Sequence, residues 1–561
     1  MMNNLALKKH LAQPKTSWQL CLLAALGGVA SAAIVILFTF SIKELQNLYL
    51  VLSANYINSD LVSRMLLPII GALVILLSAM LTGYQYLRTG IPFVLHRLKV
   101  AYGVMPLRNT VNQFIGSTLA IASGFSVGRE GPAVHLGAAC SSYIGNKLHL
   151  PFNTVRTLCA CGIAAAISAS FNTPIAAVIF VMEVILREYK VYIFIPIMIA
   201  ALVGSMITQG VYGPAHQYEF FDKIDLTVIH YPILMLFGIA LGILASVFNK
   251  SLTTLIAYSS QFSLKRRLLI AALITGICSA FVPAAISTDI QFSHFNTEFS
   301  QPVMMVLLLL LAKLLMTITA LGLGIPGGII GPILVIGAIS GVVAAEAVVP
   351  FLPGEHLPTD YALMGMAGFM AATLNAPLAA LLAVVELSGQ LEVIVPAMLV
   401  ISTACVSSGQ FFKNRSVFVM QLEVQNLLYR QPPIEKTLQR VGVLAAMNTT
   451  FELVSDTHID YLSNRYLKDE GKTLLISRAV DQPELFIWHQ ARVSEDNSVQ
   501  SFDNHPLIAI DSRATLAEAY NALSDARRGA VYIYQQDQSK ILGILPFAQI
   551  RRFLLEGNTT S

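Results

Sequence analysis

The sequence predicts an all-α polytopic membrane protein with two repeats and broken half-helices, followed by a separate α/β domain. Hydrophobic residues make up 55% of the 561 residues and charged residues only 12%, whereas charged residues are about 25% of an ordinary soluble domain. Long apolar segments continue to about residue 420 and then stop. Within that region, two pairs of motifs recur about 200 residues apart, which indicates internal repetition.

The apolar segments are of two kinds. One kind is close to the roughly 20 residues that a helix needs to cross about 30 Å of hydrocarbon. These long segments are residues 18–40, 65–82, 192–209, 230–247, 303–322 and 393–411. The other kind is shorter and interrupted by glycine or proline, at residues 114–125, 133–144 and 174–186. Such interruptions are typical of half-helices that meet inside a membrane protein.

Charge and cysteine content limit the possible partners. The net charge is only +4, and no basic stretch contains interleaved aromatic residues, so nucleic acid is not expected as a partner. Lys8, Lys9 and Lys15 precede the first long segment, and basic residues are in excess on cytoplasmic flanks. We therefore expect the N-terminus to be cytoplasmic. We also expect the C-terminus to be cytoplasmic and the protein to lie in a plasma or inner membrane. All 6 cysteines lie in or beside apolar segments, which favours packing over disulfides or metal binding.

The chain divides near residue 420, where apolar segments give way to a charged sequence with alternating strand and helix patterns. We predict a cytoplasmic N-terminal segment at 1–17, a transmembrane domain at 18–420 and a cytoplasmic domain at 421–561. The repeated motifs divide the transmembrane domain into repeats at about 18–212 and 228–420.

Two motif pairs define these repeats. GREGPAVHLG at 128–137 matches GIIGPILVIG at 328–337 through three glycines and a proline. FNTPIAAVIFVMEV at 171–184 matches LNAPLAALLAVVEL at 374–387 through shared Asn, Pro, Ala and Glu. Two matches at nearly the same offset favour a duplicated structure over chance. Broken helices at corresponding positions of two repeats indicate a binding site near the middle of the membrane.

Three segments with glycine and proline predict a site for an anion. They are TGIP at 89–92, GREGP at 128–132 and GIIGP at 328–332. A helix that begins at such a break presents free backbone N–H groups and its positive dipole end, and both favour negative charge. Each helix start contributes about 0.3–2 kcal/mol, so several must converge to replace the hydration shell of an ion. A single segment would be read as a plain loop-to-helix junction, but three with repeat symmetry favour a binding site.

Together, GREGP, GGIIGP, RTGIP and FNTP…E resemble the signature segments of the CLC family of chloride channels and chloride/proton antiporters, over roughly residues 60–420. GREGP in an apolar setting is the most specific of them. The resemblance implies inverted repeats, chloride as the substrate, and a homodimer with one anion pathway per subunit. It also implies transport without a cofactor or enzyme activity, in a family that includes voltage-gated members.

The resemblance further implies a set of anion-binding residues. The central site is expected to consist of the Thr89 and Phe418 side chains and the backbone amides of Ile329 and Ile330. Five residues of the same helix starts complete the predicted set. They are Gly90, Ile91, Gly128, Arg129 and Gly131.

Glu130, inside GREGP, carries the strongest functional prediction. An ionisable group in an apolar region is costly and marks a functional site by default. As a carboxylate among helix starts, Glu130 would compete with chloride for the same position, and as the neutral acid it would move away. The family resemblance accordingly assigns it the role of the gate. The alternative is a buried salt bridge with Arg129.

The chain departs from the commonest CLC pattern at three positions. Thr89 replaces a serine and keeps a hydroxyl donor, whereas Phe418 replaces a tyrosine and loses one. Val184 stands where proton-coupled members carry a second glutamate, and valine cannot accept a proton. We therefore predict channel-like or weakly proton-coupled transport. Strict chloride/proton antiport stays open as the alternative, because Glu183, Glu188 or water could relay protons.

Other ionisable residues within the apolar region are expected to have mainly structural roles. Glu183 and Glu386 recur by repeat symmetry, so we expect them to hydrogen-bond at helix ends. His135 is expected to be a satisfied interior histidine. Lys313 lies in the middle of an apolar segment and either contacts a carbonyl group or attracts the anion.

The region 421–561 resembles a pair of CBS modules, and the second is clearest at residues 506–554, where the order is strand, helix, strand, strand, helix. Pro546 and Gln549 stand where nucleotide-binding modules carry Thr or Ser and Asp. The resemblance therefore implies a structural or dimer-bracing role, and ATP binding is not expected.

Two other classes of protein, a serine hydrolase and a cation transporter, are the alternatives to an anion transporter. GFSVG at 124–128 matches the G-x-S-x-G nucleophile pattern, but no strand precedes it and no His–Asp pair is placed to activate the serine, which disfavours an intramembrane serine hydrolase. A cation transporter would need clustered acidic residues at membrane depth, and the apolar region carries only isolated ones.

Overall fold

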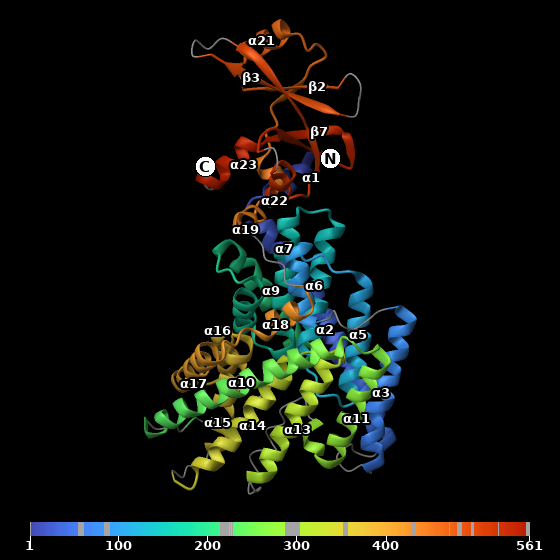
Figure 1. The fold of residues 1–561 in the computed structure, drawn as a ribbon, viewed down its shortest axis with the longest axis vertical. Coiled ribbons are helices and arrows are strands. Elements are labelled where there is room, and N and C mark those ends of the chain that lie inside the picture. Colours follow the sequence, from blue (N-terminus) through green and yellow to red (C-terminus); the bar gives the residue numbers. More distant parts are fainter. Residues whose placement is uncertain are drawn as a thin grey trace. The chain divides into compact units, whose positions relative to one another are not determined.

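The computed structural model describes most of the chain. The described residues are 2–53, 61–83, 90–213, 224, 226, 228–286, 303–351, 357–427, 433–469, 472–479, 485–494, 499–524 and 527–556. They form two compact units (Figure 1). The unit called here the membrane unit comprises Cys21–Ile144 and Thr157–Tyr429. The terminal unit comprises Met1–Leu20, Gly145–Arg156 and Arg430–Ser561.

Eight helices within the described residues are long and apolar enough to cross a membrane. They lie at Trp18–Leu48, Leu61–Thr82, Phe152–Phe171, Val191–Tyr212, Val228–Ser259, Val303–Gly322, Ile330–Val348 and Ile394–Phe411. The long apolar segments predicted from the sequence coincide with six of these helices. Phe152–Phe171 and Ile330–Val348 are additional, and they are the two whose apolar windows are most buried inside the protein.

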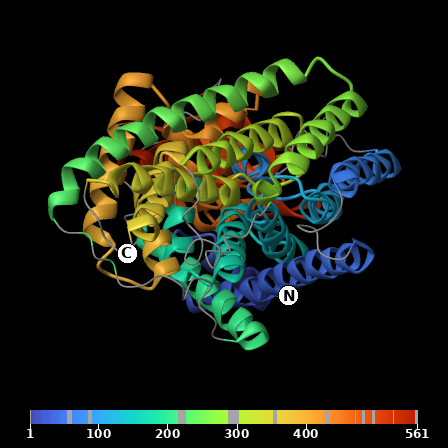
Figure 2. The ribbon, with the colours of Figure 1, turned by 90° about the horizontal axis from the view of Figure 1, so that it is seen from below.

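The helices of the membrane unit are divided between two halves of the chain. The first half contains α2 (Trp18–Ser53), α3 (Leu61–Thr82), α4 (Gly90–Val100), α5 (Leu107–Ala122), α6 (Glu130–Lys147), α7 (Phe152–Phe171), α8 (Pro174–Phe180), the π-helix η1 (Val181–Leu186) and α9 (Val191–Tyr212). The second half contains η2 (Val228–His230), α10 (Tyr231–Ser259), α11 (Leu264–Phe281), η3 (Pro283–Ile286), α13 (Val303–Gly322), α14 (Ile330–Val348), α15 (Leu357–Leu374), α16 (Pro377–Ser388), α17 (Ile394–Val406), the π-helix η4 (Ser407–Phe411) and α18 (Val417–Val424). Figure 2 shows α2 and α10 on opposite sides of this unit.

The second motif pair forms the same turn in both repeats. Asn172 and Asn375 adopt left-handed backbone conformations, with φ of 55° and 54°. Asparagine tolerates this conformation better than most residues, so it can reverse the chain between two helices. Pro174 and Pro377 then begin α8 and α16, where the missing N–H and fixed φ of proline suit the first helical position.

The two repeats are also joined by carboxylates that cap each other's helices. Glu386 in α16 accepts hydrogen bonds from the Ile175 and Ala176 N–H groups at the start of α8, at 2.9 and 2.7 Å. Glu183 makes the equivalent contact from the first repeat to the second. It accepts hydrogen bonds from the Leu378 and Ala379 N–H groups at the start of α16, at 3.3 and 2.7 Å. The expectation that these glutamates bond to helix ends is confirmed, and each occupies N–H groups that a helix leaves free.

The terminal unit contains two small sheets. The first has the order β1-β2-β3-β4, formed by β1 (Phe451–Leu453), β2 (Leu474–Arg478), β3 (Phe486–Val493) and β4 (Val499–Pro506). The second has the order β5-β6-β7, formed by β5 (Ile508–Asp511), β6 (Ala530–Gln535) and β7 (Asp537–Pro546). Its helices are α1 (Met2–Leu11), α19 (Pro433–Leu438), α20 (Val443–Ala446), α21 (Ile459–Lys468), α22 (Leu516–Leu523) and α23 (Phe547–Glu556). The order β5, α22, β6, β7, α23 is the one predicted for residues 506–554.

The turn between α6 and α7 is part of the terminal unit. Arg513 donates hydrogen bonds to the Asn146 side chain at 2.6 Å and to the Leu150 carbonyl oxygen at 3.3 Å. Its guanidinium group also lies over the Phe152 ring, 4.7 Å from the centroid. The Phe152 N–H in turn donates to the Arg513 carbonyl oxygen at 2.9 Å. One arginine therefore attaches this turn to the C-terminal α/β region.

Candidate functional site

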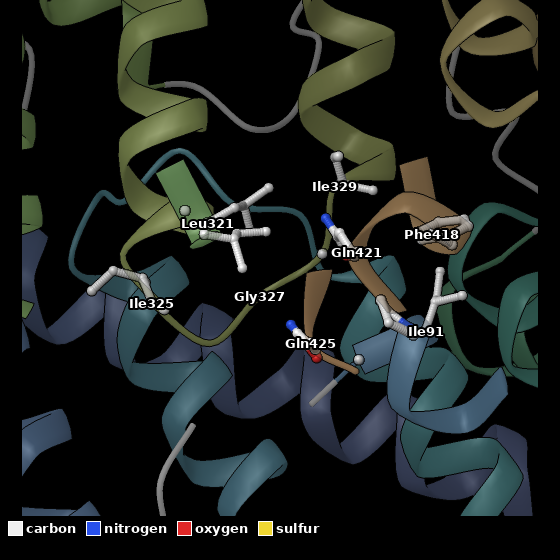
Figure 3. Close-up of a pocket in the computed structure, with 15 residues that line it drawn as sticks. Ile91, Leu321, Ile325, Gly327, Ile329, Phe418, Gln421 and Gln425 are labelled. Carbon is white, nitrogen blue, oxygen red and sulfur yellow. The ribbon is translucent and has the colours of Figure 1, made fainter. Parts of the chain in front are cut away.

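A cavity of about 70 Å³ lies inside the membrane unit where several helix starts meet (Figure 3). Its walls come from the start of α4, from Gly131 in α6, from the loop between α13 and α14, and from one face of α18. The cavity brings together five of the residues predicted from the sequence. They are Gly90, Ile91, Gly131, Ile329 and Phe418.

The other predicted residues have different positions. Gly128, Arg129 and Glu130 precede Gly131 and are not among the residues that line the cavity. Ile330 lines a separate apolar cavity of about 30 Å³. Thr89 lies outside the described residues, and its predicted contact with the anion stays a prediction.

The loops before α6 and α14 are paired across the repeats. The Gly128 N–H donates to the Gly328 carbonyl oxygen, and the Gly328 N–H donates to the Gly128 carbonyl oxygen, both at 2.7 Å. The two chains approach so closely that a Cβ on Gly131 would lie 2.6 Å from the Gly328 Cα, and a Cβ on Gly328 would lie 2.5 Å from the Gly131 nitrogen. Glycine is therefore needed at this crossing for steric reasons.

Glu130 reaches from the first repeat to the helix start of the second. Its side chain is buried, and Oε2 accepts a hydrogen bond from the Gly331 N–H in the first turn of α14 at 3.0 Å. A helix start of this kind attracts anions, so the carboxylate occupies a position that suits a free anion. The neighbouring Arg129 donates to the Ser170 carbonyl oxygen at 3.4 Å.

The backbone N–H groups at the starts of α14 and α4 differ in their hydrogen-bond partners. Ile329 is the N-cap residue of α14 and Ile330 its first residue, so their N–H groups have no partner within the helix. At α4, by contrast, the Gly90 N–H donates to Gln113 Oε1 at 2.8 Å. Gly90 has a left-handed φ of 68° and lines the cavity, but its N–H is already bonded to the protein. The role predicted for Gly90 in anion binding therefore stays a prediction, and its N–H group is occupied by Gln113.

Two side chains in the cavity wall were missed by the sequence reasoning. Gln421 and Gln425 line the cavity together with Phe418, and all three belong to one face of α18 and its C-terminal end. The signal was the spacing of three and four residues, which brings side chains to one helix face.

Several residues outside the cavity also had predicted roles. The Lys313 ammonium donates to the Ala285 carbonyl oxygen at 3.0 Å, which is one of its two predicted roles. His135 was expected to be satisfied, and this was wrong: within the described residues neither ring nitrogen has a hydrogen-bond partner, and the ring stacks on Phe93. The complete burial of His135 against Phe93, which depends on how distant helices pack and which sequence does not reveal, explains the difference. Val184 is buried in η1.

Similarity to known proteins shows to which family the chain belongs. The family model described as the voltage gated chloride channel matches residues 84–409. The chain belongs to the CLC family of chloride channels and transporters. It is accordingly a multi-pass integral membrane protein of a family that transports anions and does not comprise enzymes. The serine hydrolase alternative fails on this finding, and Ser126 shares a hydrogen bond with Thr317 instead, at 2.8 Å.

Individual CLC relatives are distant in sequence. A protein of Ralstonia nicotianae that its name places among ClcB-like chloride channels is 30% identical over 362 residues, covering 62% of this chain and 82% of the relative. An H⁺/Cl⁻ exchange transporter ClcA of Vibrio campbellii is 28% identical over 326 residues, covering 54% of this chain and 67% of the relative.

Solved CLC structures share the fold. A slow cyanobacterial Cl⁻/H⁺ antiporter has a TM-score of 0.65 at 20% identity and covers 73% of this chain and 98% of its own. A eukaryotic CLC transporter has a TM-score of 0.60 at 18% identity and covers 95% of this chain and 98% of its own. The described protein is thus largely helical with a CLC fold and carries a small C-terminal α/β region.

The glycine crossing can be tested by adding one methyl group. We expect Gly328→Ala to lower chloride flux at least about tenfold in reconstituted vesicles, because its Cβ would lie 2.5 Å from the Gly131 nitrogen and would push the two helix starts apart. Gly210→Ala in α9 is the matched control, since a Cβ there has no atom within 4 Å. Wild-type flux in Gly328→Ala protein would show that the close crossing is not required for transport.

Proposed function

We propose that this protein transports chloride, or a similar monovalent anion, through the cavity, with the Glu130 carboxylate as the gate and with channel-like or weak proton coupling. The observation that carries this proposal is the hydrogen bond between the Gly331 N–H and Glu130 Oε2, at 3.0 Å. It puts a negatively charged group at a helix start beside the cavity, where a permeating anion would also be stabilised.

The gating step follows from this competition. While Glu130 is ionised, it occupies the start of α14 and closes the path to the cavity. Protonation removes its charge and weakens its bond to the Gly331 N–H, since hydrogen bonds to charged acceptors are the stronger ones. The neutral side chain then moves away and an anion takes its place.

The character of the cavity favours an anion over a cation. Among the described residues that line it, none carries a charged side chain, and backbone of several helix starts faces it. We propose that the Ile329 and Ile330 amides donate to the anion, while Ile91, Gly131 and Phe418 shape the site. The further predicted members Thr89, Gly128 and Arg129 complete this proposal.

Weak proton coupling is favoured by two side chains. Val184 is buried and cannot accept a proton at the position where a relay would be needed. Phe418 lacks the hydroxyl that would hold an anion firmly at the centre. Strict chloride/proton exchange is the second candidate, because relatives such as the Vibrio campbellii protein are named H⁺/Cl⁻ exchange transporters. In addition, Glu188 is a buried acid that follows η1 closely, where its backbone N–H donates to the Met182 carbonyl oxygen at 3.1 Å.

The proposal extends to assembly and to the C-terminal region. Two copies would associate as a homodimer with both termini in the cytoplasm, as CLC membership implies. The two sheets, each with one parallel strand pair, support a CBS pair. Pro546 ends β7 and Gln549 lies in α23. Neither residue supplies a carboxylate for a ribose, so we propose a structural role without ATP binding.

Glu130→Gln tests the gate. The amide keeps the size of the side chain but cannot ionise, so we expect chloride flux that is nearly independent of external pH, whereas flux through the parent protein rises on acidification. Flux from vesicles is measured between about pH 4.5 and 7.5, a range that spans the ordinary titration of a carboxylate. Glu392→Gln, at an exposed position, is the control. An unchanged pH profile in Glu130→Gln would remove this residue from the mechanism.

Proton coupling is tested by recording chloride and pH together in vesicles that contain only this protein. We expect an imposed chloride gradient to drive little or no uphill proton movement, because Val184 cannot relay a proton. Glu130→Gln provides the uncoupled reference. Robust uphill pumping at a fixed ratio would contradict weak coupling and favour strict exchange.

A further inference from the structure

Helix α18 presents two carboxamide side chains to the cavity. Phe418, Gln421 and Gln425 all line it. Their spacing of three and four residues puts them on one face of the helix. Figure 3 shows Gln421 and Gln425 extending from α18 toward the segment at Gly327, which enters from the loop before α14. The two amides thus face the backbone from which α14 starts.

Burial changes steadily along this face. Phe418 is 1% exposed, Gln421 is 9% exposed and Gln425 is half-buried. An anion that enters along α18 would therefore meet Gln425 first, Gln421 next and Phe418 last. Each glutamine offers two N–H donors, whereas the phenyl ring of Phe418 offers none.

The chemistry of this face suits a monovalent anion that has to leave again. An ion gives up hydration water on entering a narrow site, and neutral donors can replace that water without holding the ion as a fixed opposite charge would. The described residues that line the cavity supply no cationic side chain. Carboxamides can also face a cation with their oxygen atoms, but the helix starts around this cavity favour negative charge.

We propose that Gln421 and Gln425 are anion ligands, and that Gln421 supplies the side-chain donor that Phe418 lacks. This inference rests on the proposed anion transport. The main binding position then lies about one helical turn from Phe418 along α18, near the Gln421 amide and the Gly327 backbone. Gln425, which is more exposed than Gln421, forms an entry position farther from Phe418. The ligand class is a small monovalent anion such as chloride, bromide or nitrate.

Gln421→Met tests the inner ligand in the full-length protein. Methionine keeps the length and shape of the side chain but removes both N–H donors. The expected result is a rise of about tenfold in the half-saturating chloride concentration for flux, since one hydrogen bond to a charged partner is lost. Gln425→Met should raise it less, because this side chain is more exposed to water. Gln490→Met, the same change at an exposed position in β3, is the matched control.

Two further variants separate loss of the ligand from general damage. Gln421→Glu keeps the shape but places a carboxylate in the cavity, so we expect flux below that of the parent protein at pH 7.5, and a ratio of variant to parent flux that rises toward one as the pH is lowered. Phe418→Tyr adds a hydroxyl donor deeper in the cavity. In the double variant with Gln421→Met, it should restore part of the lost chloride affinity.

The outcomes distinguish this inference from the proposed function. Absence of chloride flux in the parent protein would overturn the proposed transport itself. Parent flux together with a half-saturating concentration that changes less than about twofold in Gln421→Met would overturn only the role of Gln421. A tenfold shift that also occurs in Gln490→Met would equally count against it, because the effect would then not come from the cavity.

Discussion

The two hydrogen bonds between Gly128 and Gly328 hold together the loops from which α6 and α14 begin. Because both partners are glycines and Gly131 also packs against Gly328, the backbones of the two repeats cross at a distance that no side chain would allow. The helix starts are therefore brought to one place by backbone alone. The cavity, its glycine-rich wall and the reach of Glu130 to Gly331 all depend on this crossing.

The repeats exchange carboxylates as well as backbone bonds. Glu183 and Glu386 each accept two consecutive N–H groups at a helix start of the opposite repeat. Glu130 accepts the Gly331 N–H group in the first turn of α14, again across the two repeats. The difference lies in the surroundings, because Glu130 is followed directly by Gly131 in the cavity wall, whereas no sequence neighbour of Glu183 or Glu386 lines the cavity. One way of joining the repeats thus serves structure at two sites and, in our proposal, gating at the third.

The sequence predicted what local chemistry determines. Motif spacing predicted the duplication, the helix starts at glycine and proline, and the bonding of Glu183 and Glu386 to helix ends. It could not predict features that depend on how distant helices pack. Gln113 accepts the Gly90 N–H only because α5 lies beside the start of α4. The His135 ring is buried and stacked on Phe93, and neither ring nitrogen has a hydrogen-bond partner among the described residues. Gln421 was not predicted because its position in the cavity wall depends on which face of α18 turns toward the cavity.

The central claim is that an anion binds in this cavity between the start of α14 and the carboxamide face of α18. Anomalous X-ray diffraction from crystals of the full-length protein grown in bromide tests it most directly, because bromide replaces chloride and can be located without ambiguity. The account predicts an anomalous peak beside the Gln421 side chain and the Ile329 backbone nitrogen, and a second peak at the Glu130 position in Glu130→Gln crystals. A cavity without bromide in both proteins, with peaks only elsewhere, would contradict it.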